Sequence, residues 1–135
     1  MTITAPVHAE PSAAFVSAFI AASEQARQPA ATTEDLDAFL AFLADDVTDH
    51  HIAYARSFEG TAHLKKGIPQ KVASMVSIAQ DIESIILGSN TAVVVVNERS
   101  EYYRNETLRQ YEGRTILILR FDEEGLINEI RRYLD

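Results

Sequence analysis

Several residue types and patterns are missing from this chain of 135 residues, and each absence excludes a class of protein. There is no cysteine, which excludes disulfide scaffolds, thiol nucleophiles and cysteine-rich zinc sites. No uncharged apolar run approaches the roughly 18–20 residues that span a bilayer. The first ten residues lack the basic start and apolar core of a signal peptide. We therefore expect a cytoplasmic protein with no membrane partner.

Positive charge is also scarce. Twelve Lys and Arg stand against twenty Asp and Glu, which gives a formal net charge of −8. A net negative chain repels phosphate backbones, so nucleic acid is not expected as the main partner. The hydrophobic content of 47% and the charged content of 24% are ordinary for a folded protein. We expect a flexible tail over residues 1–10 and a single domain over residues 11–135.

The first half of the chain has helical periodicity. Apolar residues recur on one helical stripe over about 15–27, and a second helix is expected over about 32–43, with a threonine cap and acidic residues in its first turn. A short strand is expected over 47–54. Gly67 and Pro69 should interrupt the next helical region, so that a new helix starts at Pro69 and runs to about Ser77.

The second half changes to the two-residue period of strands. Four strands are expected, over 82–87, 91–103, 107–121 and 126–134. The breaks between them are short and polar, which is typical of antiparallel hairpins. The expected fold class is therefore α+β, with helices first and a curved antiparallel sheet after them.

Two of these strands contain runs that are apolar on both faces, 93–96 and 116–119. An antiparallel sheet with one wet face would alternate apolar and polar residues instead. The helices can cover one face, and we expect a second copy of the chain to cover the other. The sequence thus predicts a homodimer through the outer face of the sheet. The alternatives are a wrapped N-terminal tail or a tolerated apolar surface.

The order of these elements resembles one known superfamily. The segments that carry the resemblance are LADDV at 43–47, FEG at 58–60, RFDEEGLI at 120–127 and RRYLD at 131–135. Together they resemble the SnoaL-like, nuclear transport factor 2-like superfamily over roughly Phe15 to Asp135. The resemblance implies a cone-shaped α+β fold in which the helices close an apolar pocket; many members are dimers and many need no cofactor. The superfamily includes both enzymes and binding modules, so fold alone does not give function.

The segment Asp49-His50-His51 offers the first chemical groups. On a strand, Asp49 and His51 point to one face and His50 to the other. An imidazole beside a carboxylate is a suitable general base near neutral pH. Resemblance to the epoxide-hydrolase and ketosteroid-isomerase branches also implies that His51 lies in the pocket. The alternative is an exposed polar strand end; a metal site is less favoured because no third ligand is evident.

A second set of polar residues ends an apolar strand. Asn97, Arg99 and Glu101 share one face, which we expect to be the inner one. A cation and a carboxylate two residues apart can orient a hydroxyl or stabilise an oxyanion. The segment resembles the Arg-x-Asp strand of the epoxide hydrolases, with Glu101 in place of Asp. The alternative is an ordinary surface ion pair.

Three positions depart from the resembled enzymes. Arg132 stands where the epoxide hydrolases have the carboxylate that activates water, and an arginine cannot take that proton. Arg132 can instead bind an anionic or enolate-like oxygen, or pair with Glu129 or Glu101. In the ketosteroid isomerases, a phenol stands at the position of Phe19 and a proton-donating Asp at that of Leu117. Without these donors, steroid isomerisation is disfavoured.

The residues expected to bind the substrate are Tyr54, Tyr103, Asn97, Phe19 and Leu117. A phenol can donate a hydrogen bond in the pocket, and half-buried packing is the alternative for each tyrosine. The hypothesis is a cofactor-independent enzyme of lyase, isomerase, cyclase or hydrolase type, which transfers protons on a small apolar or aromatic substrate. His51 would be the base, oriented by Asp49. The alternative is a non-catalytic small-molecule-binding or assembly module. No metal or other cofactor is expected.

Overall fold

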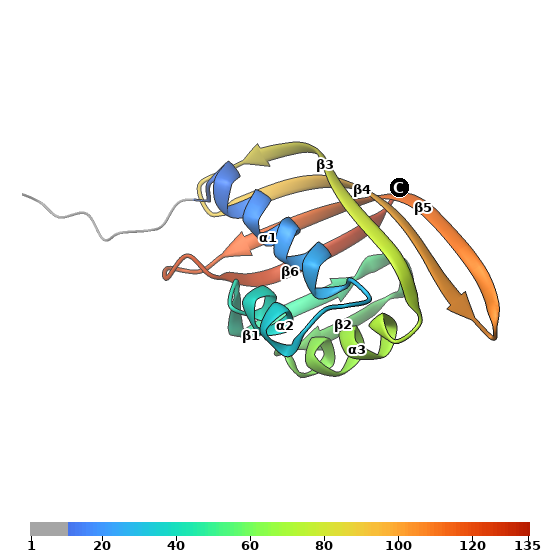
Figure 1. Ribbon diagram of the computed structural model, residues 1–135. Helices are drawn as coiled ribbons and strands as arrows, with labels where there is room; N and C mark the ends of the chain where they lie inside the picture. Colours follow the sequence, from blue (N-terminus) through green and yellow to red (C-terminus); the bar gives the residue numbers. More distant parts are fainter. Residues whose placement is uncertain (1–10) are drawn as a thin grey trace, which may run out of the picture.

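The sheet is the frame of the molecule. In this computed structural model, which describes residues 11–135, six strands form one curved sheet in the order β2-β1-β6-β5-β4-β3 (Figure 1). All neighbouring strands are antiparallel except β1 and β6, which run parallel. The strands are β1 (Leu43–His51), β2 (Arg56–Glu59), β3 (Met75–Leu87), β4 (Thr91–Arg104), β5 (Thr107–Phe121) and β6 (Ile127–Leu134).

Three helices lie on the concave side of this sheet (Figure 1). They are α1 (Ala13–Ala26), α2 (Thr33–Leu40) and α3 (Ala62–Val72), and the short 3-10 helix η1 (Ile52–Tyr54) follows β1. The Ser12 side chain caps α1 by accepting a hydrogen bond from the Phe15 backbone. A capping box formed by Thr32 and Asp35 starts α2. Local side-chain chemistry therefore fixes where both N-terminal helices begin.

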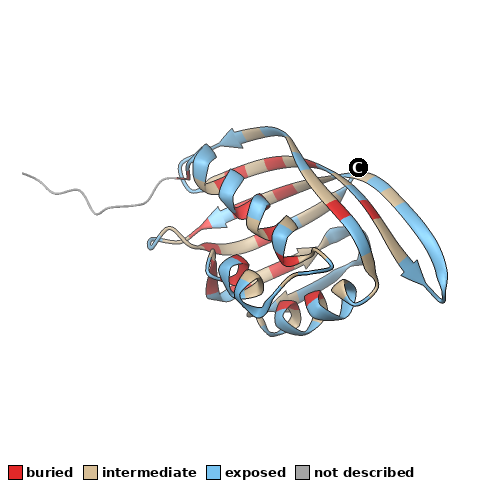
Figure 2. Cartoon of the chain, in the orientation of Figure 1, coloured by how far each residue is buried: buried red, intermediate tan, exposed pale blue. Residues whose placement is uncertain are grey.

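The hydrophobic core lies between the helices and the concave face of the sheet. Figure 2 shows the buried positions on the helices and on the strands that they cover, whereas the far ends of β4 and β5 are exposed. Phe19 of α1 stacks on Phe39 of α2, with ring centroids 5.4 Å apart. From the sheet, the most buried core side chains include Val94, Leu119, Ile127 and Ile130.

The α+β fold class is confirmed, with one correction to the sheet and one to the helices. The sheet is not purely antiparallel, because β1 lies beside the C-terminal strand β6 in parallel. The region around Gly67 and Pro69 does not break: α3 runs through both residues. Leu64 and Ile68 are buried against the core, and this packing offsets the hydrogen bond that Pro69 cannot donate.

Some element boundaries also differ from the expected ones. The second helix ends at Leu40, because β1 already begins at Leu43. The strand β3 begins at Met75, where the sequence predicted a helix, and the short strand β2 was not expected. The tail expected over residues 1–10 lies outside the described residues.

The faces of β4 are the reverse of those expected. Val94 and Val96 are buried on the concave face, and their neighbours Val93 and Val95 lie on the outer face and are only half-buried. Because side chains alternate along a strand, a shift of one residue moves every polar side chain of β4 to the other face. The expectation that Asn97 and the residues that share its face point inward is therefore wrong.

This assignment of faces predicts unequal effects of two identical substitutions. Val94→Ala should lower the free energy of unfolding by about 2 kcal/mol, because it removes two fully buried methyl groups and leaves a cavity. Val95→Ala should cost clearly less when the chain is dilute enough to be monomeric, since its side chain is half-exposed in the single chain. Urea unfolding of the two variants checks this, and equal costs would contradict the assignment.

Candidate functional site

A buried carboxylate forms the centre of the polar site on the concave face. Asp49 of β1 has an exposed fraction of 0%. The Arg132 guanidinium donates to it from Nε to Oδ1 at 2.9 Å and from Nη2 to Oδ2 at 3.4 Å. Nε2 of His63 lies 3.0 Å from Oδ2, and Nε2 of His51 lies 3.5 Å from the same oxygen. One carboxylate thus gathers three nitrogen-bearing side chains.

The parallel pairing of β1 with β6 creates this arrangement. The register places His51 directly beside Arg132 and Asp49 beside Ile130, all on neighbouring strands. His63 comes from the first turns of α3, which β2 and the turn at Gly60 lead into. Gly60 adopts a positive φ of 76° there, which glycine tolerates best.

A phenylalanine separates the two imidazoles. The ring of Phe58 stacks on His63, with centroids 4.6 Å apart and planes at 8°. The same ring meets His51 edge-on at 5.9 Å. Since Phe58 pairs with Asp49 across the β1–β2 ladder, it holds both histidines at fixed positions around the carboxylate. His50 faces away from this site and contacts Ser57 and Glu129 instead.

The environment fixes the charges of these groups. Burial alone would raise the pKa of Asp49, but the charge and hydrogen bonds of Arg132, with contributions from His63 and His51, outweigh it and lower that pKa. Asp49 is therefore an anion at neutral pH. Burial also lowers the pKa of His51 from its ordinary 6.5, and the charges of Arg132 and Lys71 add to this against the opposing effect of Asp49. His51 is neutral at pH 7 and can accept a proton.

A second polar network extends from α1 to strands β3 and β4, still on the concave face of the sheet. Nη1 of Arg27 donates to the Ser23 hydroxyl at 2.6 Å, and that hydroxyl donates to Gln80 at 2.8 Å. The amide of Gln80 then donates to Glu98 at 2.9 Å. The Arg27 guanidinium also lies over the Phe39 ring, 5.0 Å from its centroid. This chain of contacts fixes Arg27 and Glu98 on the concave side.

The two networks influence each other electrostatically. Burial and then the positive charge of Arg132 lower the pKa of Arg27 to about 10, so Arg27 remains a cation. Lys71 of α3 is exposed as a residue, yet partial burial of its ammonium group and the charges of Arg27 and Arg132 lower its pKa. Glu98 and Asp49 act on both cations in the opposite direction. Three cations and two carboxylates thus share one region.

One phenol belongs to the same face. Tyr111 of β5 pairs with Ser100 in the β4–β5 ladder, two residues from the pairing of Glu98 with Gly113. Its ring covers Gly113, so that a side chain on this glycine would overlap it. Burial, followed by the negative charge of Glu98, raises the pKa of Tyr111. The phenol is therefore protonated at neutral pH and can donate a hydrogen bond.

The structure brings together only some of the residues that the sequence singled out. Asp49, His51 and Arg132 converge, and Arg132 pairs with Asp49 instead of Glu129 or Glu101. Leu117 lies beside Arg132 across the β5–β6 ladder and is buried in the core, as is Phe19.

Four of the other predicted residues lie on the outer face of β4, away from the site. Arg99 is 65% exposed on the outer face and pairs with Asp81 at 3.5 Å, and Glu101 accepts from Gln110. Asn97 and Tyr103 are exposed on that same face, and Tyr54 in η1 is 68% exposed. These positions follow from the reversed faces of β4, since all four β4 residues have odd numbers.

Sequence reasoning missed five residues that the structure places on the concave side: Arg27, His63, Lys71, Glu98 and Tyr111. A signal was present for two of them. His63 and Lys71 are eight residues apart, which is the spacing of one helical face, but the expected break at Pro69 concealed it. For Glu98 there was no such signal. The apolar run before it does not show which face of β4 is the inner one, so either Glu98 or its neighbour Arg99 could have pointed inward.

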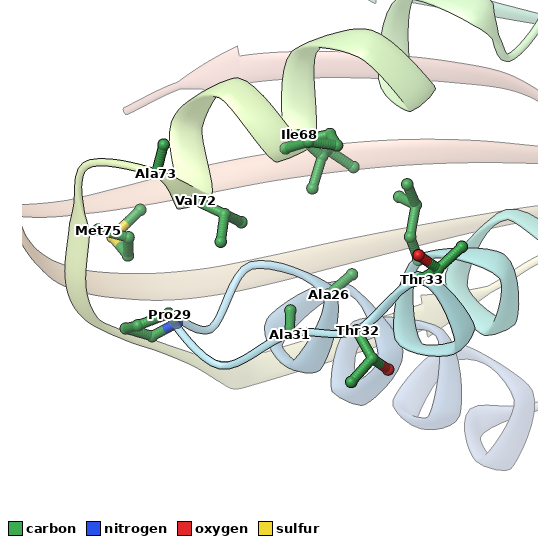
Figure 3. A pocket seen from close by; sticks show the side chains of 11 residues that line it. Ala26, Pro29, Ala31, Thr32, Thr33, Ile68, Val72, Ala73 and Met75 are labelled. Carbon is green, nitrogen blue, oxygen red and sulfur yellow. The ribbon is translucent and has the colours of Figure 1, made fainter.

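A groove also opens between the helices, and none of the charged residues of the polar site lines it. Figure 3 shows its walls, which come from the end of α1, the loop into α2, and α3. Its volume is about 390 Å³, within the range of small-molecule sites. The lining is mostly apolar, and includes Ala26, Ile68, Val72 and Met75, with Thr32 and Thr33 as its polar residues.

Metal binding and membrane insertion each require features that can be looked for in residues 11–135. Over this range, no group of three or more His, Asp or Glu side chains is arranged to hold a metal ion. No helix in the described part of the chain has the length and apolar character needed to cross a membrane.

The buried position of Asp49 predicts a pH-dependent loss of stability on substitution. Asp49→Asn should lower the free energy of unfolding by about 3 kcal/mol at pH 7, because Arg132 and His63 lose a charged partner. A carboxyl with a depressed folded-state pKa stabilises the fold above its ordinary pKa of 3.8, and this contribution disappears as the pH falls through the lower folded-state value. The difference between wild type and variant should therefore shrink in acid.

Urea unfolding at pH 7 and at pH 3 measures both parts. Asp81→Asn is the matched control, because its carboxylate pairs with Arg99 on an exposed face and should contribute little at either pH. Equal effects of the two substitutions would show that Asp49 does not have the stabilising role inferred from its contacts.

Comparison with known proteins places this geometry in a family. No curated protein matches the chain in sequence. Among solved structures, a putative SnoaL-like polyketide cyclase from Shewanella denitrificans has a TM-score of 0.76 at 12% identity, over 90% of this chain and 88% of that one. An NTF2-like protein of unknown function from Burkholderia pseudomallei has a TM-score of 0.70 at 17% identity, with the same two coverages.

A protein from Catenulispora acidiphila with a ketosteroid isomerase-like fold, in complex with trimethylamine, has a TM-score of 0.70 at 15% identity, over 91% of this chain and 86% of that one. Identities this low support the fold alone. The family of SnoaL-like domains, however, matches residues 11–130, which is most of the sequence. The curved sheet, the three covering helices and this match together show that the chain belongs to the SnoaL-like domain family.

Proposed function

We propose that this protein is a cofactor-independent enzyme that transfers protons on a small, largely apolar or aromatic organic molecule. The observation that carries the proposal is a neutral imidazole, His51, held beside a carboxylate that is fixed as an anion, Asp49. Such a pair supplies a base that is ready at neutral pH and an anion that stabilises the imidazolium formed when the base takes a proton.

His51 is a better base here than Asp49. The carboxylate is fully buried and already accepts from Arg132 and His63, and its lowered pKa makes it a weak base. The His51 side chain keeps 31% of its surface exposed. With Nε2–H directed at Asp49, its Nδ1 retains the lone pair that would accept the substrate proton.

Positive charge can stabilise the product of that step. Removing a proton next to a carbonyl places negative charge on its oxygen, and fixed donors that face this oxygen lower the barrier. Arg132 uses Nε and Nη2 for Asp49, and within residues 11–135 its Nη1 makes no hydrogen bond. We assign Nη1 of Arg132 to the developing oxyanion, with the Tyr111 phenol as a second donor.

These roles suit a lyase, isomerase, cyclase or hydrolase whose central step is proton transfer. The family match is compatible with a small organic substrate, since the SnoaL-like fold is shared with a putative polyketide cyclase. The alternative is a non-catalytic binding module of the same fold. This alternative is favoured by Arg132, which stands where a second catalytic carboxylate would be expected.

The proposal predicts that His51 controls proton transfer. The probe is phenylpyruvate, whose benzylic hydrogens exchange with D₂O through an enol, and NMR measures the exchange catalysed by the protein. His51→Gln should lower kcat/KM for this exchange by at least about 100-fold, the usual effect of losing a general base. The wild-type rate should fall as the pH drops through the pKa of His51, which lies below 6.5, and stay level above it.

His50→Gln is the matched control, since His50 faces the other side of the sheet. It should leave the exchange unchanged. If wild-type protein and His51→Gln catalyse exchange equally, His51 is not the base. If wild type catalyses none, the acid–base proposal fails and the binding-module alternative stands.

We also infer that two copies of the chain associate through the outer face of the sheet. On this face Val95 pairs with Ile116 and Val93 with Ile118, and all four side chains are half-exposed. The exposed Ile86 of β3 lies beside Val93 and extends the apolar patch. Ion pairs that include Arg114 with Glu83 and Asp135, and Arg99 with Asp81, flank the patch. An apolar centre with a polar margin is the usual anatomy of a protein interface.

A charge placed in this patch should separate the two copies. Wild type should have the mass of a dimer in light scattering, and Val95→Glu should shift it to a monomer, because an unpaired carboxylate in an apolar interface is costly. Val76→Glu, at an exposed position of β3 outside the patch, should remain dimeric. A monomeric wild type at high concentration would contradict the inference.

A further inference from the structure

We propose that Arg27 and Lys71 form a subsite for a carboxylate group on the ligand, so that the substrate is an apolar or aromatic organic acid. The inference rests on the proposed function in placing the ligand beside His51. It adds a second point of recognition, on the side of the site formed by α1 and α3, and it can be tested by binding alone.

The first support is that Arg27 and Lys71 lack carboxylate partners. Within residues 11–135, neither cation has a carboxylate oxygen within 4.0 Å. Arg27 uses only Nη1, which donates to the Ser23 hydroxyl and to the Ser23 carbonyl at 3.1 Å. Its remaining N–H groups make no hydrogen bond to described residues, and guanidinium groups with free donors bind carboxylates well.

The second support is the balance of charge. Asp49 is already engaged by Arg132 and His63, and Glu98 accepts from Gln80. Among the groups that act on one another here, three cations stand against two carboxylates, which leaves one positive charge in excess. Arg27, Lys71 and Arg132 also repel one another, which contributes to the lowered pKa of Arg27 and of Lys71. A bound anion would relieve this repulsion, whereas a neutral ligand would not.

The third support is open space beside these groups. Gly67 lies between His63 and Lys71 on one face of α3, because the three residues are four apart. A Cβ atom at Gly67 would meet no atom within 4 Å. Glycine inside a helix costs about 0.5–1 kcal/mol relative to alanine. This glycine thus leaves room for a ligand in front of α3, at a position where a side chain longer than that of alanine would project into that room.

The experiment compares two flat aromatic probes of the same shape, cinnamate and its neutral amide, by titration calorimetry. Wild type should bind cinnamate at least about tenfold more tightly than cinnamamide. Lys71→Met should weaken cinnamate about tenfold and leave cinnamamide unchanged, and Arg27→Gln should do the same. Lys66→Met, which removes a charge from an exposed position of the same helix, should bind both probes as wild type does.

Two substitutions of Gly67 test the space itself. Gly67→Leu should weaken both probes at least about tenfold, because its side chain occupies the room in front of α3. Gly67→Ala is the matched control: it should retain binding and raise the free energy of unfolding slightly, since alanine favours the helix. Because Lys71 is exposed, its variant should fold even if Arg27→Gln disturbs the network with Ser23.

The outcomes separate this inference from the proposed function. His51→Gln should still prefer cinnamate while losing proton exchange. A charge-dependent preference without any exchange activity would support the subsite and contradict the enzyme. Exchange activity with equal binding of the two probes would contradict the subsite alone. Absence of cinnamate binding by wild type, or unchanged affinity in Lys71→Met, would also overturn the subsite.

Discussion

A carboxylate with no exposed surface needs partners, and meeting this need for Asp49 organises the molecule. Burial of an unpaired charge costs several kcal/mol, so Asp49 is compatible with the fold only if cations or N–H donors surround it. Arg132 reaches it because β6 lies parallel to β1, and His63 reaches it because α3 lies on the concave face. The first and last strands of the domain and one helix are thus joined at a single group. The interaction that stabilises this junction is also the one that sets the charges of the site.

Because Asp49 is committed to these contacts, the chemical roles divide among its neighbours. The carboxylate stays ionised and provides negative potential, which leaves the partly exposed imidazole of His51 as the group that can exchange protons. Arg27 of α1, Lys71 of α3 and Arg132 of β6 provide positive potential on the same concave face. The net charge of −8 for the whole chain therefore says little about its ligand, because much of the acidic charge lies in caps and turns such as Asp122–Glu124. The local balance on the concave face favours an anion, the opposite of what the total would suggest.

The sequence predicted the fold class, the two N-terminal helices, the four C-terminal strands, and the shared face of Asp49 and His51, because each depends on local patterns. Prediction from the sequence failed where the residue pattern was equally compatible with two arrangements. The run Val93–Val96 is apolar at every position, so it cannot show which face of β4 is inner, and Arg99 was chosen in place of Glu98. The parallel neighbour of β1 is a tertiary contact that spans most of the chain, so the pairing of Arg132 with Asp49 had no local signal. Gly67 and Pro69 were interpreted as a helix break, whereas burial of Leu64 and Ile68 overrides that local preference.

The runs of β4 and β5 that are apolar on both faces have a physical explanation if both faces of the sheet are covered. Helices cover Val94 and Leu117 on the concave side, and a second copy would cover Val95 and Ile116 on the outer side. Strands covered on both faces contain continuous apolar runs, as buried parallel strands do. The polar residues that follow the run then alternate between the two faces. Glu98 points into the site, and Arg99 lies at the edge of the outer apolar patch. One strand would thereby position a ligand-facing carboxylate and a dimer-facing cation through the same backbone. Covering the outer face would hold β4 and β5 in place, and this would keep Glu98 and Tyr111 in register with the Asp49 network on the other side.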